Sequence, residues 1–242
     1  MKILALDSSG IVASVAVVED DTLLAEYTVN YKKTHSQTLL PMLDEIVKMT
    51  ELELESVDAI AVAAGPGSFT GLRIGSATAK GLGLALKKPL VAVPTVDALA
   101  YNLYDAQGLI CPIMDARRKQ VYTGIYRFEE HQLMTLKEQW AAPIEELLEE
   151  LNQRGEMATF LGDGVPVFRE LIAEKLQVPY SFAPAHVNKQ RAAAVAALGS
   201  IYYKEGRTET AMEHIPEYLR VSQAERERAE REKEQKPAGT KI

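Results

Sequence analysis

The chain has 242 residues, of which 47% are hydrophobic, which is enough for two modest domains or one large one. Its 34 acidic and 27 basic side chains give a net charge of −7, which argues against a protein that holds nucleic acid unaided, because phosphate contacts dominate such binding. Cys111 is the only cysteine, which excludes an internal disulfide and a cysteine-based metal cluster.

The N-terminal segment predicts three antiparallel strands. Apolar runs at residues 3–6, 12–18 and 23–29 are separated by short polar turns, and Glu19-Asp20-Asp21 is typical of a hairpin. The first apolar run is too short for a signal peptide, and no apolar stretch is long enough to cross a membrane. We therefore expect a cytoplasmic protein that does not associate with membranes.

The first predicted strand ends in Asp7, followed by Ser8, Ser9 and a glycine. Two interpretations of this carboxylate stay open. It either accepts hydrogen bonds from its own turn, as aspartates in turns commonly do, or it coordinates a metal–phosphate group.

Residues 36–49 predict a helix with an unusually wide apolar surface. Its main apolar stripe and a second flank comprise Leu39, Leu40, Leu43, Ile46 and Val47, with Met42 and Met49 beside them. This width indicates contact on more than one side. His35 precedes the helix, where a single histidine is more typical of a cap than of a metal ligand.

A strand at residues 57–64 leads through Gly65-Pro66-Gly67 into a helix that ends near Leu86, with Ser68 and Thr70 as candidate N-caps. One row of this helix, four residues apart, is nearly bare backbone: Gly71, Gly75, Ala79 and Gly83, with Ala77, Gly81 and Ala85 beside it. Interior glycines cost about 1 kcal/mol each, so we expect close packing against this helix. The covering element is the chain's own fold, a helix of another subunit, or both. The loop at Gly65, Gly67 and Ser68 could also donate N–H groups to an anion, but it lacks the lysine and the spacing of a P-loop.

The order of predicted strands at the start of the chain then occurs a second time. After a strand at 90–93 and a helix at 95–104, a strand at 110–114 ends in Asp115 and is followed by strands at 120–128 and 133–137. A strand that ends in a carboxylate and leads into a hairpin thus occurs twice, which predicts an internal repeat. The second turn contains Arg117, Arg118 and Lys119, which form either a solvated tip or a contact with an anion or partner.

The remaining pattern predicts helices at 144–153, 167–176 and 188–204 and a strand at 157–161. Gly162-Asp163-Gly164 is a turn signal first and a ligand loop second. From Ser222 the chain alternates acidic and basic residues and is predicted to be a solvated helix or disordered. We expect three regions: an N-terminal domain at 1–105, a C-terminal domain at 106–221 and a charged tail at 222–242.

The repeated opening resembles the actin/Hsp70/hexokinase superfamily. This resemblance implies an α/β fold with two tandem actin/Hsp70-like (ASKHA, ribonuclease H-like) domains, each with a mixed sheet flanked by helices. More specifically, LALDSS at 4–9, HSQTLLP at 35–41, AAGPGSFTGLRIG at 63–75 and PEYLR at 216–220 closely resemble the TsaB (YeaZ) family over about residues 1–221.

The resemblance implies a function in forming threonylcarbamoyladenosine (t6A) at position 37 of tRNAs that read ANN codons. Proteins of this family are non-catalytic partners of the TsaD transferase, and the TsaE ATPase joins the complex. The helices at 36–49 and 70–86 would contact TsaD, and the same surface would form a homodimer when TsaD is absent. tRNA would be reached indirectly, through the complex, and any adenylate, ATP or ADP would bind only at the interface with TsaD.

Partner contact is expected from apolar and small residues of the two helices: Leu39, Leu43, Ile46, Gly71, Ile74, Gly75, Thr78, Ala79 and Leu82. No catalytic residue or metal ligand is expected, because TsaD-like relatives carry an HxxxH metal motif and His35 is followed four positions later by Leu39. The alternative is an ASKHA-type phosphotransferase or ATPase that uses loop residues Asp7, Ser8, Ser9, Gly65, Gly67, Ser68 and Asp163. A metallopeptidase-like hydrolase is the least favoured interpretation, since it would require the missing metal site.

Overall fold

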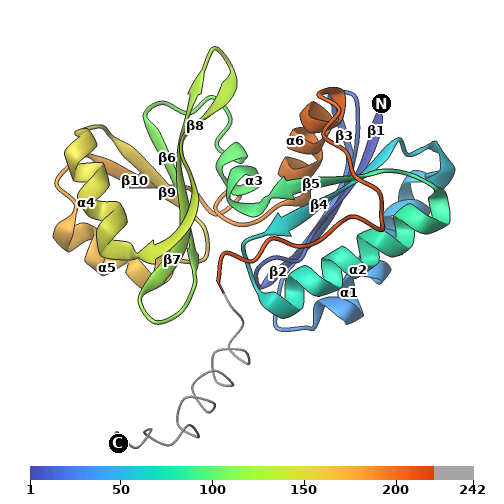
Figure 1. The fold of residues 1–242 in the computed structure, drawn as a ribbon, viewed down its shortest axis with the longest axis horizontal. Coiled ribbons are helices and arrows are strands. Elements are labelled where there is room, and N and C mark those ends of the chain that lie inside the picture. Colours follow the sequence, from blue (N-terminus) through green and yellow to red (C-terminus); the bar gives the residue numbers. More distant parts are fainter. Residues whose placement is uncertain (221–242) are drawn as a thin grey trace, which may run out of the picture.

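The computed structural model describes residues 1–220 and divides them into two lobes, each built on a five-stranded mixed sheet (Figure 1). The tail predicted from Ser222 lies outside the described residues. The predicted fold class, an α/β chain with two ASKHA-like units, is confirmed.

The first lobe contains the strands β1 (Lys2–Asp7), β2 (Val12–Glu19), β3 (Thr22–Asn30), β4 (Ala59–Gly65) and β5 (Leu90–Pro94). Their order is β3-β2-β1-β4-β5. The first three form the predicted antiparallel meander, and β4 and β5 add in parallel. The helices between them are α1 (His35–Thr50), the single 3₁₀ turn η1 (Leu54–Ser56) and α2 (Phe69–Leu86), and α3 (Thr95–Tyr101) follows β5.

The second lobe repeats this topology, with strand order β10-β9-β6-β7-β8 and the same pattern of antiparallel and parallel pairs. Its strands are β6 (Leu109–Asp115), β7 (Gln120–Glu129), β8 (Gln132–Pro143), β9 (Ala158–Leu161) and β10 (Tyr180–Phe182). The helices of this half of the sequence are α4 (Ile144–Arg154), α5 (Val165–Lys175) and α6 (Ala192–Lys204).

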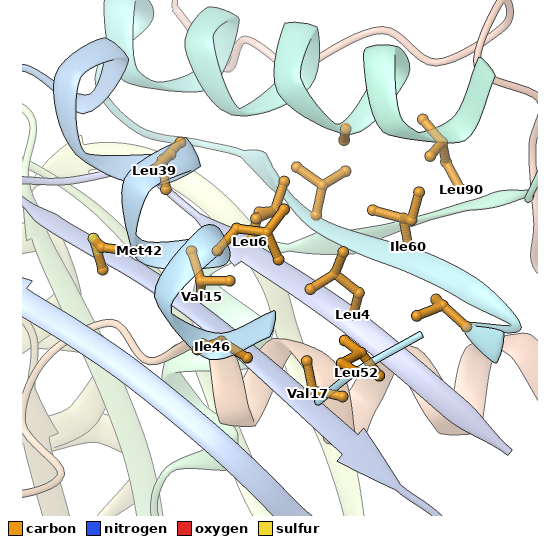
Figure 2. Packing of buried hydrophobic residues seen from close by; sticks show 14 of the residues in the cluster. Leu4, Leu6, Val15, Val17, Leu39, Met42, Ile46, Leu52, Ile60 and Leu90 are labelled. Atoms are coloured by element: carbon orange, nitrogen blue, oxygen red, sulfur yellow. The ribbon is translucent and has the colours of Figure 1, made fainter. Parts of the chain in front are cut away.

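Alternation along β1 covers both faces of the first sheet, because successive side chains of a strand point to opposite sides. Leu4 and Leu6 pack under α1 and α2, as Figure 2 shows. Ile3 and Ala5 face the other side and pack against α6. The first sheet is therefore the middle layer of three.

The third helix of each half lies on the sheet of the other half. Helix α3 follows the first sheet, yet Leu99 packs with Ile110 and Met114 of β6. Helix α6 follows the second sheet, yet Val195 packs with Ile3 of β1. The two helices also contact each other at the centre of the molecule, so the lobes are interlocked (Figure 1). Helix α6 thus lies within the predicted second domain in sequence and packs on the first lobe in space.

Several boundaries differ from those predicted. Helix α6 begins at Ala192 and not at Asn188, because the carbonyls of Asn188 and Lys189 accept hydrogen bonds from Gly162 and Asn102 at 2.9 and 2.7 Å. Strand β8 extends to Pro143, α3 ends at Tyr101, and the three-residue strand β10 was not predicted.

Candidate partner-binding surface

Helix α2 begins at one of the two N-caps that the sequence indicated and ends at a residue in the left-handed conformation. The Ser68 hydroxyl accepts a hydrogen bond from the backbone N–H of Gly71 at 3.3 Å, which makes Ser68 the N-cap. Thr70, the other candidate, lies inside the helix. At the far end Lys87 adopts a left-handed conformation, with φ of 54°, and closes the helix.

The small-residue row of α2 faces the chain's own fold. A Cβ atom at Gly71 would overlap the carbonyl oxygen of Ser8, and one at Gly75 would overlap the Ser8 hydroxyl. A Cβ atom at Gly83 would lie 3.0 Å from the side chain of Leu90. The turn after β1 and the start of β5 therefore cover this row, so of the covering elements considered it is the chain's own fold that lies against it.

The nine residues predicted to contact a partner divide by burial. Six lie in the core or against Ser8: Leu39, Leu43, Ile46, Gly71, Gly75 and Ala79. Figure 2 shows Leu39 and Ile46 pointing from α1 toward the sheet. The other three, Ile74, Thr78 and Leu82, are half-buried and reach the surface.

The outward sides of α1 and α2 carry several apolar and small residues that the prediction did not include. Leu40 and Met49 of α1 are 54% and 83% exposed, and Leu84 of α2 is 61% exposed. Ala77, Gly81 and Ala85 lie on the same helix as Leu84 and also reach the surface. We call the following set the α1–α2 surface: Leu40, Met49, Ile74, Ala77, Thr78, Gly81, Leu82, Leu84 and Ala85.

Gly81 differs from the other helical glycines. Apart from the neighbouring backbone of α2 itself, no atom of residues 1–220 lies within 4 Å of the position that its Cβ would occupy, so packing among these residues does not explain the absence of a side chain. A glycine in the middle of a helix costs about 1 kcal/mol relative to alanine. No contact among residues 1–220 offsets this cost. A partner that packs closely against Gly81 would explain why a glycine stands there.

A C-terminal segment, residues 209–220, runs antiparallel to α2 along its other side, as Figure 1 shows. We call it the strap. Its Ala211 lies beside Gly83, its His214 carbonyl accepts a hydrogen bond from Lys80 at 2.9 Å, and its Tyr218 ring stacks on Phe69 with centroids 4.0 Å apart. The PEYLR sequence thus holds the strap against the start of α2.

The strap also covers the glycine loop after β4. The backbone N–H of Glu217 donates to the carbonyl of Ala64 at 2.7 Å, and the Glu217 carbonyl fills the space that a Cβ at Gly65 would need. Gly65 has φ of 125°, a backbone conformation that residues with a side chain rarely adopt. Beyond it, Arg220 donates to the Ala116 carbonyl in the second lobe at 2.6 Å. The strap therefore links the two lobes.

Asp7 orders its own turn. Its Oδ1 accepts hydrogen bonds from the Ser9 backbone at 2.9 Å and the Ser9 hydroxyl at 2.7 Å, and Ser8 donates its hydroxyl to the Gly71 carbonyl at 2.8 Å. Burial raises the pKa of the Asp7 carboxyl, although the Ser9 hydrogen bonds and the nearby His35 oppose this shift. The carboxylate accepts bonds from its own turn, as the first of the two interpretations expects.

The loops considered for a phosphate use their donors within the chain. Gly65 donates to the Thr95 hydroxyl at 3.2 Å, and Ser68 donates to the Ser9 carbonyl at 2.6 Å. Gly67 packs so closely on Ser9 that a Cβ would overlap it. In the second lobe, the Gly162 and Gly164 N–H groups donate to Asn188 and Ile113 carbonyls, both at 2.9 Å.

Asp163, like Asp7, uses its carboxylate to accept a hydrogen bond from the backbone of the chain. Its Oδ1 accepts the backbone N–H of Asp115 at 3.2 Å, at the carboxyl end of β6. Burial raises the pKa of the Asp163 carboxyl, while the hydrogen bond from Asp115 and the charge of Lys189 oppose this shift. The predicted loop residues thus fall into a first-lobe group around Ser9 and a second-lobe group around Asp163.

The four histidines are separated in the fold. His35 lies at the start of α1 with Nε2 2.8 Å from the Gly10 carbonyl oxygen, and His214 lies in the strap with Nδ1 2.6 Å from a Glu209 carboxylate oxygen. Within residues 1–220, no three histidine, cysteine or acidic side chains are grouped so that they could hold a metal ion.

A cleft of about 790 Å³ lies between the lobes. Its walls come from α3, α6, β8 and the strap, and include Asp97, Gln139, Tyr202 and Glu217. None of the predicted site residues lines it. Among the described helices, none combines the length and the apolar character needed to span a bilayer.

Comparisons with known proteins agree with this arrangement. A family model described as "TsaD: tRNA N6-adenosine threonylcarbamoyltransferase" matches residues 22–228. A tRNA threonylcarbamoyladenosine biosynthesis protein TsaB from Bacillus subtilis (strain 168) is 34% identical over 225 residues, which cover 93% of this chain and 96% of the relative. Its counterpart of the same name from Escherichia coli (strain K12) is 32% identical over 225 residues, covering 91% and 95%.

Solved structures give the same match. A structure of YeaZ from Pseudomonas aeruginosa is 25% identical and superimposes with a TM-score of 0.75, covering 90% of this chain and 99% of the other. A second structure from that organism, described as an uncharacterized protein with similarity to peptidase YEAZ, gives 26% identity and a TM-score of 0.76 with the same coverage. The likeness therefore extends over both lobes.

Proposed function

The chain belongs to the TsaB (YeaZ) family of tRNA threonylcarbamoyladenosine biosynthesis proteins, and we propose that it acts there as a docking subunit with no reaction of its own. In this proposal it pairs with a TsaD-type transferase through the α1–α2 surface and activates N6-threonylcarbamoylation of adenosine 37 in tRNAs that read ANN codons. The TsaE ATPase joins the pair in the cytoplasm. Without the transferase, two copies pair through the same surface.

The observation that carries this proposal is the exposed glycine of α2. Gly81 has open space where a side chain would lie, and Leu84 projects from the same helix with 61% of its surface exposed. Small residues on a helix let another backbone approach closely, and exposed apolar neighbours gain from being covered. Helix α1, which contacts α2, carries two further exposed apolar side chains, Leu40 and Met49.

The N–H groups of the glycine loops already donate hydrogen bonds within the chain, and this supports a subunit that does not catalyse a reaction. A phosphotransferase would need N–H groups aimed at the transferred phosphate, and those of Gly65, Ser68, Gly162 and Gly164 are bonded to the chain itself. The alternative function would require these loops to break their hydrogen bonds, and the strap to leave Gly65, before a nucleotide could bind.

Arginine substitutions on the α1–α2 surface test the proposal. Ala77→Arg and Gly81→Arg each add a long charged side chain to exposed positions, so the chain should keep its melting temperature within a few degrees. Pairing with the transferase, and of two copies, should weaken at least about tenfold, because a charge would be buried without a partner. Light scattering of the mixed proteins measures this, with t6A formation as the functional readout.

Ala173→Arg is the matched control, because Ala173 is also an exposed helical alanine but lies on α5 of the second lobe. It should pair as the unmodified chain does. If Ala77→Arg and Gly81→Arg pair as tightly as Ala173→Arg, the α1–α2 surface is not the docking site.

A further inference from the structure

The turn between β6 and β7 carries three consecutive cations that the proposed function does not use. We propose that this basic turn, Arg117–Lys119, together with Arg220, contacts the phosphate backbone of the tRNA while the chain is paired with the transferase. The inference rests on the proposed function for the identity of the RNA, but it concerns a different surface on the other lobe.

The charge of the basic turn is largely unneutralised. Arg117 is 85% exposed and has one acidic neighbour, with its Nη1 3.3 Å from the Asp115 carboxylate. Arg118 and Lys119 are exposed and make no ion pair with any residue in 1–220. Since the whole chain carries a net charge of −7, this cluster is a local positive patch on an acidic protein.

The backbone of the basic turn is unfavourable for these residue types. Arg117, Arg118 and Lys119 have φ values of 64°, 55° and 59°, all in the left-handed region. Glycine or asparagine would adopt this conformation more readily than long side chains do. A turn selected for its backbone alone would not be expected to contain three long cationic residues, which indicates that their charge has a use.

Hydrogen bonds hold the basic turn in place. The Asp115 carboxylate accepts the N–H of Arg117 at 2.8 Å, and Ala116 donates to the Gln120 carbonyl at 2.9 Å. Arg220 of the strap donates to the Ala116 carbonyl at 2.6 Å and so adds a fourth cation beside the other three. These bonds fix the backbone of the turn, so they hold the points from which the cationic side chains extend, which favours contact with a regularly spaced polyanion.

RNA fits this group better than a protein partner does. Contacts between proteins usually centre on buried aromatic or aliphatic anchors, whereas the exposed residues of this turn are all cations. The acidic residues in the first turn of α4, Glu145 and Glu146, follow Ile144, whose N–H donates to the Lys119 carbonyl at 3.3 Å. They would repel an anion on the side of α4, so the phosphates should approach the turn from the side away from α4.

The test removes the charge while keeping the backbone relaxed. In Arg118→Asn/Lys119→Gly, both new residues tolerate positive φ, so the melting temperature should stay the same or rise. The variant should pair normally with the transferase by light scattering. Its complex should bind an unmodified tRNA that reads an ANN codon roughly tenfold more weakly at about 0.1 M salt, and the slope of log K against log salt should fall by about two.

The control Lys175→Gln/Lys204→Gln removes two exposed lysines, at the ends of α5 and α6, and should leave the tRNA affinity unchanged. Equal tRNA affinity and salt slope for the Arg118→Asn/Lys119→Gly complex and the unmodified complex would overturn the inference. So would a loss of pairing, because the turn would then contact the transferase. If the unmodified chain does not pair at all, the proposed function fails, and the tRNA affinity of the chain alone then decides the inference.

Discussion

Tyr126 of β7 donates a hydrogen bond of 2.7 Å to the carboxylate of Asp97 on α3. Tyr202 of α6 donates to the second oxygen of the same carboxylate at 3.3 Å. Burial raises the pKa of Asp97, while the two hydroxyl donors oppose that shift. One carboxylate thus joins a strand of the second sheet to the two helices that the halves exchange.

The Tyr126→Phe substitution should destabilise the chain by about 2 kcal/mol at pH 7, because it removes a hydrogen bond to a buried charged group. Denaturant unfolding measures the change. Tyr27→Phe, at an exposed position on β3, is the control and should change stability by less than about 0.5 kcal/mol. Equal effects of the two substitutions would show that the bond to Asp97 contributes little.

Asp97 should also make stability depend on pH. Its pKa is higher in the folded chain than the ordinary value of 3.8, so the folded state binds more protons above about pH 4. The contribution of Asp97 to stability therefore falls as pH rises from 3.8 through the raised pKa, and the loss is complete above that pKa. The amide introduced by Asp97→Asn cannot ionise. The stability of this variant relative to the unmodified chain should thus be higher at about pH 7 than at about pH 4, and a flat difference would contradict this.

Two glycines of α2 should respond oppositely to alanine. At Gly71 the new methyl group would overlap the Ser8 carbonyl oxygen, so Gly71→Ala should cost about 2 kcal/mol or more. At Gly81 the space is open, so Gly81→Ala should stabilise the isolated chain by about 1 kcal/mol through helix propensity. Thermal unfolding of both variants checks the pair, and a destabilising Gly81→Ala would mean that the chain itself packs there.

Loss of the ring at Tyr218 should loosen the strap. Tyr218→Ala removes the stack on Phe69, which is worth about 1 kcal/mol beyond the area it buries. Amide exchange at residues 211–218 should become faster, while the core of β6 stays protected. Ile215→Ala in the same segment is the control, because Ile215 is 75% exposed and should not change exchange. Similar exchange in all three proteins would show that the stack does not hold the strap.

Calorimetry with ATP and Mg²⁺ separates the two candidate functions. We expect no saturable binding to the isolated chain, since the N–H groups of the glycine loops are engaged and the strap covers Gly65. Asp7→Ala should lower stability by disrupting the turn at Ser9, and should not alter any nucleotide response. Saturable binding that Asp7→Ala abolishes would instead favour the phosphotransferase.

Most of the fold could be predicted because its signals are local. Alternation of apolar residues identified the meander of β1 to β3, and Ser68 marked the start of α2 by its capping chemistry. The repeat was visible because Asp7 and Asp115 end equivalent strands. Strand β10 could not be predicted from the sequence, because its three residues are too few to show an alternating pattern.

The location of the surface was harder to predict, because it depends on contacts distant in sequence. The row of small residues on α2 showed that one side of the helix is bare, but not that Ser8 lies against Gly71 and Gly75. Leu40, which is exposed, had the same place in the predicted apolar stripe as its buried neighbours on α1. The strap was visible only as the short sequence PEYLR, since nothing local indicates that Tyr218 stacks on Phe69.

The exchange of α3 and α6 bears on how the chain folds during its synthesis. When the ribosome has made the five strands of the first sheet, the face that carries Ile3 and Ala5 has no cover, because α6 is encoded about a hundred residues later. That apolar face stays open to water or to chaperones until Lys204 has left the exit tunnel. The N-terminal half therefore cannot complete its core until α6 has been made, and the final packing of both halves depends on that helix.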